Sequence, residues 1–580
     1  MTNYTPPLDD MRFALEHIAD LPGINQLPGY EAATPDLVAQ ILEEAGKLAA
    51  NELAPLNTPG DREGALLENG VVRTPAGFKE AYRHFTDGGW NGLPFPEEWG
   101  GQGLPWTVAT AVGEMWHSAN MSFGLCPLLT QAAVELLLKF GTDKQRALYL
   151  AKLVSGEWTG TMCLTEPQAG SDVGGLKTRA VRDGDHYRIH GTKIFITFGE
   201  HDYTDNIIHM VLARLPDAPA GTRGISLFIV PKFLVNDDGS LGQRNDLRCV
   251  SLEHKLGIRA SPTCVMSFGD DDGAIGTLVG EEHGGMRAMF TMMNHARLAV
   301  GLEGLAIGER AYQDALAYAR ERVQGRRSNG GAARIIDHAD VRRMLMTMKT
   351  QIEAMRALVY LAAAALDHSL RAADAESRQR AQHRLDLLIP LVKAWCSDLG
   401  FEIASSAIQV HGGMGYIEET GVAQHLRDAR INMIYEGTNG IQALDLVGRK
   451  LHLADGGAIA ELLAELGADL TAIEAAGEVE LHGPLEAALA TLEQTTTWLQ
   501  SDHGADADAA AAGATPYLRL FATTLGGFLL ARSALAARAL EGDIARAKRA
   551  SAHFYMTRVL PPAVALGPVA RAGSAFLQPE

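Results

Sequence analysis

Short runs of strand-forming residues, confined to a middle stretch from about residue 160 to residue 280, constrain the fold of this 580-residue chain more than any other feature. The runs occupy residues 186–190, 193–197, 207–213 and 225–230 and are rich in Ile, Val, Phe and Tyr, a composition typical of β-strands. An Asp-Gly pair at 183–184 precedes the first run, and this pair favours a hairpin turn. Helices do not alternate with these runs, which argues against a doubly wound parallel sheet. We therefore predict a compact antiparallel β domain.

Both flanks of this stretch carry helical periodicity. After residue 285, apolar residues recur at steps of four and three, a spacing typical of a packed bundle helix; they are Val341, Leu345, Met348, Ile352, Met355, Val359 and Ala362. The Ala- and Asp-rich residues 502–516 are expected to form an inter-helix loop or tether. We predict an α+β multidomain chain with an N-terminal helical domain (1–158), a β domain (159–282), a C-terminal helical bundle (283–450) and an extra helical extension (451–580).

Composition excludes some classes of protein. Lys and Arg number 51 against 70 Asp and Glu, a net charge of −19, which repels nucleic acid and anionic lipid. The five cysteines show neither CxxC pairs nor zinc-finger spacing, so we expect a reducing cytoplasmic location and no metal site. We also expect no membrane span, because by this reasoning no apolar stretch approaches the ~18 residues that a spanning helix needs.

Three segments are richer in glycine and polar residues than their flanks. They are residues 162–175 (MCLTEPQAGSDVGG), 409–416 (QVHGGMGY) and 434–442 (IYEGTNGIQ). In the first segment, the hydroxyls of Thr165 and Ser171 and a glycine-permitted backbone are suited to cradling an anionic cofactor. In the third, a carboxylate enclosed beside Tyr435 would have a raised pKa, as a general base needs. Taken alone, the segment favours Glu436 as an ordinary solvated turn residue over Glu436 as a base.

Together with the IFIT run at 194–197, these segments resemble the acyl-CoA dehydrogenase family of flavoproteins over roughly residues 40–450. The extension after residue 450 resembles the long-form bacterial branch, which includes enzymes for methylthiopropanoyl-CoA and for fatty acyl-CoAs. The resemblance implies that FAD lies between the β domain and the bundle. It also implies α,β-dehydrogenation of an acyl-CoA thioester to the trans-2-enoyl-CoA, with Glu436 as base for the α-proton and hydride transfer from Cβ to flavin.

The resemblance also implies residue roles. Its cofactor contacts correspond to Met162, Leu164, Thr165, Ser171, Phe195, Thr197, Arg322, Gln409, Gly412, Gly413 and Thr438. Its substrate contacts correspond to Ser171, Arg297, Tyr435 and Gly437. Some members carry the base just before the arginine that matches Arg297, but Ala296 occupies that position here and cannot accept a proton.

The same resemblance implies partners. An electron-transfer flavoprotein would be the acceptor, and Arg322 with residues 409–413 would reach a neighbouring subunit's cofactor, which implies a homo-oligomer. A dimer is favoured over a tetramer, because the extension would cover the surface that pairs dimers. Two alternatives are an acyl-CoA oxidase and a non-catalytic flavin-bearing protein associated with nucleic acid. The second is disfavoured by the acidic extension, which holds 8 Lys and Arg against 15 Asp and Glu.

Overall fold

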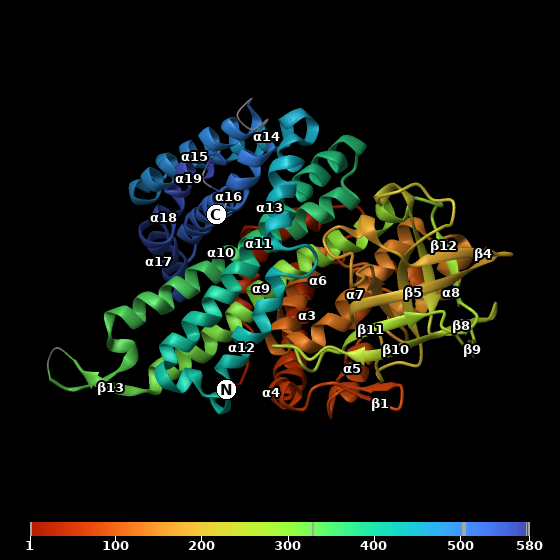
Figure 1. The fold of residues 1–580 in the computed structure, drawn as a ribbon. Coiled ribbons are helices and arrows are strands. Elements are labelled where there is room, and N and C mark those ends of the chain that lie inside the picture. Colours follow the sequence, from red (N-terminus) through yellow and green to blue (C-terminus); the bar gives the residue numbers. More distant parts are fainter. Residues whose placement is uncertain (1–2, 328–329, 502–505, 576, 578–580) are drawn as a thin grey trace. The chain divides into compact units, whose positions relative to one another are not determined.

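The computed structural model describes residues 3–327, 330–501, 506–575 and 577 (Figure 1). Contacts within the chain divide it into two compact units. Unit 1 comprises Met1–Gly46, Pro105–Ser118 and Arg297–Glu580, and unit 2 comprises Lys47–Leu104 and Ala119–Ala296. Each unit is therefore assembled from segments that lie far apart in the sequence.

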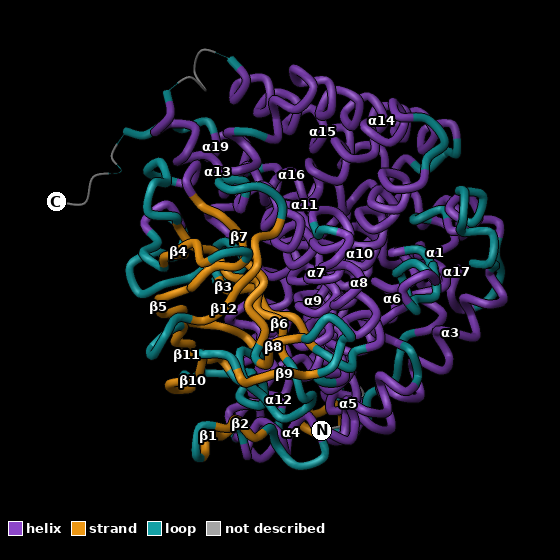
Figure 2. The backbone as a smooth tube through the Cα atoms, turned by 90° about the vertical axis from the view of Figure 1, so that its right-hand side faces the viewer, coloured by secondary structure: helices purple, strands orange, loops and turns teal. Residues whose placement is uncertain are grey.

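Unit 2 is built around an eight-stranded sheet, in which seven strands follow the order β10-β11-β5-β12-β7-β6-β3 and β4 pairs with β5 and β6 (Figure 2). Strands β6 and β7 are buried along nearly their whole length, which explains their continuous apolar sequences. The strands of the sheet are β3 (Thr159–Cys163), β4 (Arg179–Asp183), β5 (His186–Thr197), β6 (Ile207–Arg214), β7 (Ile225–Pro231), β10 (Leu247–Leu252), β11 (Thr263–Phe268) and β12 (Ala274–Val279). Two small antiparallel pairs accompany it, namely β1 (Leu66–Glu68) with β2 (Val71–Arg73) and β8 (Phe233–Val235) with β9 (Leu241–Arg244).

The predicted hairpin and fold class are confirmed, with one local difference. Strands β4 and β5 pair antiparallel, and Asp183 stands opposite His186 across the turn that contains Gly184. Most other pairs are also antiparallel, but β3 runs parallel to β6, and β4 pairs with β6 in parallel at Arg179 and Arg214. Parallel pairing needs a long crossover connection, and here the intervening chain, which includes β4 and β5, provides it.

Helices of unit 2 pack beside this sheet. Helix α7 contacts β3, and the Thr130 hydroxyl of α7 accepts a hydrogen bond from the Gly160 amide at 3.1 Å. The helices of this unit are α4 (Ala54–Glu63), α5 (Phe78–Asp87), α7 (Met121–Phe140), α8 (Asp143–Ser155) and the first part of α9 (Gly285–Glu321). Helix α7 therefore holds β3 in place just before the first predicted cofactor segment, residues 162–175.

Unit 1 is helical apart from the short β13 (Val323–Arg326) and β14 (Ala332–Arg334) pair (Figure 1). Helices α10 and α11 pack along each other, and the predicted apolar stripe of α10 is buried from Leu345 onwards. The longer helices are α1 (Leu8–His17), α3 (Pro35–Leu48), α6 (Trp106–Ala119), α9, α10 (Ala339–Arg371), α11 (Ala375–His411), α12 (Val422–Ala429), α13 (Asn439–Gly448), α14 (Gly457–Ala475), α15 (Val479–Gln500), α16 (Ala507–Ala536) and α17 (Asp543–Arg558). Short helices α2 (Leu21–Ile24), α18 (Leu560–Val564) and α19 (Leu566–Ala570) complete the set.

The expected loop over residues 502–516 is wrong from residue 507 onwards, where helix α16 begins; residues 502–505 lie outside the described part of the chain. Alanine is the strongest helix former, and the Asp506 carboxylate accepts hydrogen bonds from the Asp508 and Ala509 amides at the N-terminus. Composition therefore favours a helix here, despite the proline at position 516.

Among the described residues, two helices are long and apolar enough to cross a membrane, namely Met121–Phe140 and the run Ala507–Ala539. The expectation that no apolar stretch reaches this length was therefore wrong. In each helix, 83% of the most apolar window is buried inside the protein. Burial of this kind is typical of core helices, and it leaves little apolar surface of either helix for lipid.

Candidate active site

The segment that carries Glu436 is a tight turn between the 3₁₀ turn Arg430–Met433 and helix α13. Glu436 has φ +57° and Gly437 has φ +85°. A left-handed conformation is uncommon outside glycine and costs of order 1–3 kcal/mol, so the surrounding structure must hold it. Thr438 then caps α13, because its hydroxyl accepts a hydrogen bond from the Ile441 amide at 3.2 Å.

Three side chains of unit 1 hold this turn. Arg297, a buried residue of α9, donates from Nε to the Glu436 carbonyl at 3.4 Å. Gln442 donates from Nε2 to the same carbonyl at 3.4 Å. The Tyr435 hydroxyl donates to the Glu303 carboxyl group and to Asn432. None of the described residues accepts a hydrogen bond from the Glu436 amide N–H, so this donor remains available to a ligand.

Burial changes the protonation of this cluster. It raises the pKa of Glu436 to about 7, although the charges of Arg297 and Lys393 oppose the shift. Burial likewise raises the pKa of Glu303 to about 8 and lowers that of Lys393 to about 7. Glu303, Lys393 and Asn439 were missed by sequence reasoning. A single carboxylate within the apolar run LAVGLEGLAIG of α9 was the available signal for Glu303.

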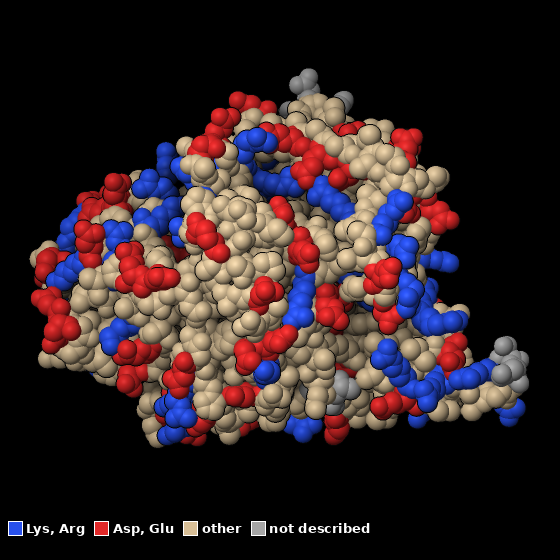
Figure 3. Space-filling model, turned by 180° about the vertical axis from the view of Figure 1, so that it is seen from behind, with Lys and Arg blue, Asp and Glu red and all other residues tan. Residues whose placement is uncertain are grey.

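The residues predicted to reach a neighbouring subunit's cofactor gather at one end of unit 1. Gln409, Gly412 and Gly413 are exposed at the C-terminus of α11, and Gly412 ends this helix with φ +61°. The rings of Tyr318 and His411 stack with centroids 4.3 Å apart, which brings this end of α11 to the end of α9 just before Arg322. Arg322 is exposed at the base of the β13–β14 arm, where Lys and Arg side chains gather (Figure 3).

The remaining predicted cofactor residues lie in unit 2, where β3 and β5 meet. The Ile194 amide donates to the Thr165 carbonyl at 2.9 Å, which joins the two segments. Phe195 has φ +59° and lies where the pairing of β5 with β11 is irregular. Bulges of this kind re-aim side chains, and the Phe195 side chain is 58% exposed. Met162 and Thr197 are half-buried, Leu164 is buried, and Ser171 is exposed on the following loop.

A buried ion pair that sequence reasoning missed fixes these two segments to each other. Lys193 Nζ lies 2.8 Å from Glu166 Oε1, and the two side chains are 0% and 3% exposed. Lys193 also donates to the Leu164 carbonyl at 2.9 Å. Burial would raise the pKa of Glu166, but the Lys193 charge and hydrogen bonds from the Lys177 and Thr178 amides lower it to about 2.

Within each unit, the residues predicted to bind the cofactor have side chains or backbone suited to part of a flavin nucleotide. An exposed aromatic ring beside threonine hydroxyls suits a flat heteroaromatic ring with polar edges. At Gly412 and Gly413, an added Cβ atom would meet nothing within 4 Å, so the backbone there is open to a ligand. The chemistry of these residues is therefore compatible with a flavin nucleotide, and their roles in binding it stay predictions.

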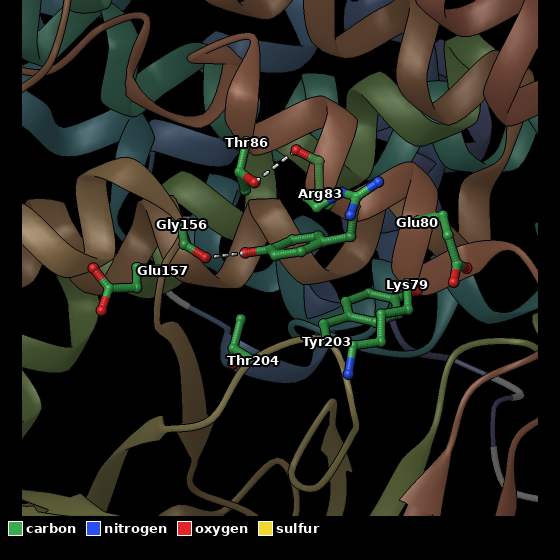
Figure 4. Close-up of a pocket in the computed structure, with 9 residues that line it drawn as sticks. Lys79, Glu80, Arg83, Thr86, Gly156, Glu157, Tyr203 and Thr204 are labelled. Carbon is green, nitrogen blue, oxygen red and sulfur yellow. Dashed lines mark hydrogen bonds between the residues drawn. The ribbon is translucent and has the colours of Figure 1, made fainter. Parts of the chain in front are cut away.

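Unit 2 also holds a hollow of about 230 Å³ that contains none of the predicted site residues (Figure 4). The Tyr82 hydroxyl donates to the Gly156 carbonyl at 2.9 Å, and the Tyr82 and Tyr203 rings stack with centroids 4.8 Å apart. The remaining lining residues are Lys79, Glu80, Arg83, Thr86, Glu157 and Thr204. This hollow contributes no group to the chemistry described above.

Comparison with known families agrees with the fold. Models of the acyl-CoA dehydrogenase N-terminal, middle and C-terminal domains match residues 37–157, 161–270 and 283–452, and an acetyl-CoA dehydrogenase C-terminal-like model matches 460–577. The chain belongs to the acyl-CoA dehydrogenase family, a class of flavin-dependent oxidoreductases.

Individual relatives match between 80% and 97% of the chain. A 3-methylmercaptopropionyl-CoA dehydrogenase of Ruegeria pomeroyi is 49% identical over 574 residues, which cover 96% of each chain. A butyryl-CoA dehydrogenase of Syntrophomonas wolfei is 38% identical over 479 residues, 80% of this chain and 78% of the relative. The structure of Caenorhabditis elegans ACDH-11 in complex with C11-CoA superposes with a TM-score of 0.76 at 22% identity, covering 97% of this chain and 93% of that one. This last likeness shows the fold alone, including the helical extension.

Proposed function

We propose that this protein binds FAD and oxidises an acyl-CoA thioester to the trans-2-enoyl-CoA, with Glu436 as the base that removes the α-proton. The observation that carries the proposal is the Glu436 turn, in which a carboxyl group with a pKa near 7 is held in a left-handed conformation by Arg297 and Gln442. A general base works best when its pKa lies near the working pH.

The chain's own groups supply the proton chemistry. The Glu436 carboxylate takes the proton from Cα, and the electron pair left on Cα forms the Cα–Cβ double bond as the Cβ–H bond breaks. FAD, when bound, would accept the hydride from Cβ. The free amide N–H of Glu436 would donate to the thioester carbonyl and stabilise the negative charge that develops there. Arg297 fixes the carbonyl of the same residue and so orients both groups.

The substrate class is supported by the relatives. One acts on 3-methylmercaptopropionyl-CoA and another on butyryl-CoA, so we propose a short acyl-CoA, with or without a sulfur in the chain. The test is anaerobic mixing of the FAD-loaded protein with 3-methylmercaptopropionyl-CoA, butyryl-CoA and palmitoyl-CoA, following loss of flavin absorbance. Rapid bleaching by a short thioester supports the proposal, and no bleaching by any of the three contradicts it.

We further propose a homodimer, and an electron-transfer flavoprotein as the acceptor of the electrons. Exposed Arg322, Gln409, Gly412 and Gly413 support the first part, as does the adjoining apolar surface of Met414, Tyr416 and Ile417, which are 49%, 87% and 44% exposed. Light scattering that gave a monomer with full FAD occupancy would contradict the dimer. Reoxidation of the reduced protein by oxygen with release of peroxide, in preference to reduction of the flavoprotein, would indicate an oxidase instead.

A further inference from the structure

A lysine outside the predicted site ties the base segment to helix α11. Lys393 lies in the middle of α11 and is fully buried. Its Nζ donates to Asn439 Oδ1 at 2.9 Å. Asn439 is the first residue of α13 and stands three residues after Glu436. Lys393 therefore contacts the chain at the point where the strained turn becomes a helix.

The side chain of Asn439 forms hydrogen bonds with four residues of α11. Its amide nitrogen donates to the Ala394 carbonyl at 3.1 Å, to Ser397 Oγ at 3.0 Å and to Asp398 Oδ1 at 2.7 Å. The amide oxygen accepts from Lys393 Nζ at 2.9 Å and from Ser397 Oγ at 3.3 Å. A left-handed Glu436 persists only if its neighbours fix the chain on both sides. Arg297 and Gln442 act on Glu436 itself, and Asn439 acts on the side towards α13.

Lys393 also contributes charge to this cluster. Arg297 and Lys393 both act on the Glu436 carboxylate when they are protonated. Burial lowers the pKa of Lys393 to about 7, so Lys393 is about half protonated at pH 7 and carries its charge more fully at lower pH. The acidic neighbour Glu303 has a pKa of about 8 because of burial, so at pH 7 it is mainly neutral and opposes these cations little. The other charged groups that face the cluster are Asp398 on α11, Asp445 on α13 and Arg449 just after the end of α13.

We propose that Lys393 is a positioning residue for the base: it anchors the start of α13 through Asn439 and, when protonated, brings a buried positive charge into the cluster around Glu436. This inference rests on the proposed function, in which Glu436 is the base. It adds that the base depends on a residue 43 positions earlier in the chain that carries no role in the predicted site.

The two contributions have different physical signatures. A carboxylate that loses a nearby cation in a buried site titrates at higher pH, by about one unit or more. Loss of the Asn439 anchor alone leaves the charge in place, so it loosens the turn without moving the titration of Glu436. Substitutions at the two positions therefore separate charge from anchoring.

The test uses the FAD-loaded, full-length protein and infrared spectroscopy as a function of pH. The protonated carboxyl band that is absent from Glu436→Gln reports the titration of Glu436 directly. In Lys393→Met we expect this midpoint to rise by about one pH unit or more, whereas Lys393→Arg and Asn439→Ala should keep it near the wild-type value. Lys349→Met is the matched control, because Lys349 pairs with Glu353 on α10 at 3.0 Å and is not among the charges that act on Glu436.

Flavin reduction gives a second readout. If the midpoint of Glu436 moves from pH 7 to pH 8, the carboxylate fraction at pH 7 falls about fivefold, and the rate should fall equally and recover at higher pH. A Lys393→Met titration that matches that of Lys349→Met would overturn the proposal. If Lys393→Met does not retain FAD, the same titration is carried out on Lys393→Gln, which keeps a polar end group without the charge. The same criterion then decides.

Failure of the proposed function gives a different result. In that case the wild-type protein would not reduce its flavin with any acyl-CoA, while the infrared midpoints of wild type and Lys393→Met could still be compared. A raised midpoint in an inactive protein would support the role of Lys393 and refute the reaction. An unchanged midpoint in an active protein would refute only the role of Lys393.

Discussion

Substitution of Lys193 by Met should destabilise the part of unit 2 where β3 and β5 meet. The change removes a cation that is 0% exposed and leaves the Glu166 carboxylate, 3% exposed, with only amide donors. Removing one partner of a buried ion pair typically costs about 3–5 kcal/mol. A domain is stable by only about 5–15 kcal/mol, so the loss should be large and local, and FAD binding should weaken with it.

Hydrogen exchange of the backbone amides of β5, followed by mass spectrometry, measures the free energy of local opening. The matched control is Lys177→Met, because the Lys177 side chain is exposed on the same loop, and this change should cost less than about 0.5 kcal/mol. Glu166 has a folded pKa of about 2 against 4.5 ordinarily, so its stabilising contribution is complete above pH 4.5 and is lost as the pH falls towards 2. The difference in the free energy of local opening between wild type and Lys193→Met should therefore become smaller as the pH falls towards 2. Equal opening free energies for Lys193→Met and Lys177→Met at pH 7 would refute the reasoning.

Three further outcomes follow from the same structure. Because Glu436 must be ionised to accept a proton and its pKa is about 7, flavin reduction should rise with pH through 7, and the rate at pH 6 should be about one tenth of the plateau; a rate that is flat from pH 6 to 8 in stopped-flow measurements would be inconsistent with this. Glu303 has a pKa of about 8 and is mainly neutral at pH 7, so Glu303→Gln should leave the rate at pH 6–7 within about threefold of wild type, and a loss of a hundredfold would assign Glu303 an ionised role. Phe195→Gly should relieve the strain of the positive φ and leave the melting temperature equal or higher. Equilibrium dialysis of this variant should show weaker FAD binding, and an unchanged FAD affinity would mean that the Phe195 ring does not contact the cofactor.

Much of the fold follows from local sequence patterns. The Asp-Gly turn determines the β4–β5 hairpin, and the apolar stripe of α10 marks its buried face. These features depend on residues a few positions apart, which sequence alone displays. The predicted loop over 502–516 was wrong from residue 507 because the helix propensity of its alanines and the Asp506 cap favour a helix.

The candidate site was predicted less completely, for a physical reason. Glu436 stood out because it lies in an unusual short segment, but its neighbours Glu303 and Lys393 lie on two long helices and are 90 residues apart in the sequence. Each alone looks like an ordinary helix residue. Only the packing of α9, α11 and the turn reveals that both are buried and that their charges act on Glu436. The same holds for the left-handed Phe195, whose exposure depends on irregular pairing with a strand about 70 residues later.

The most direct test of the central claim is rapid mixing of Glu436→Gln with a saturating acyl-CoA that reduces the wild-type flavin. Gln keeps nearly the same volume and can occupy the same turn, but it cannot accept the α-proton. The account predicts normal FAD content and acyl-CoA binding, with flavin reduction slower by about 10²–10⁴-fold. Flavin reduction within about tenfold of wild type would mean that the base lies elsewhere in the chain.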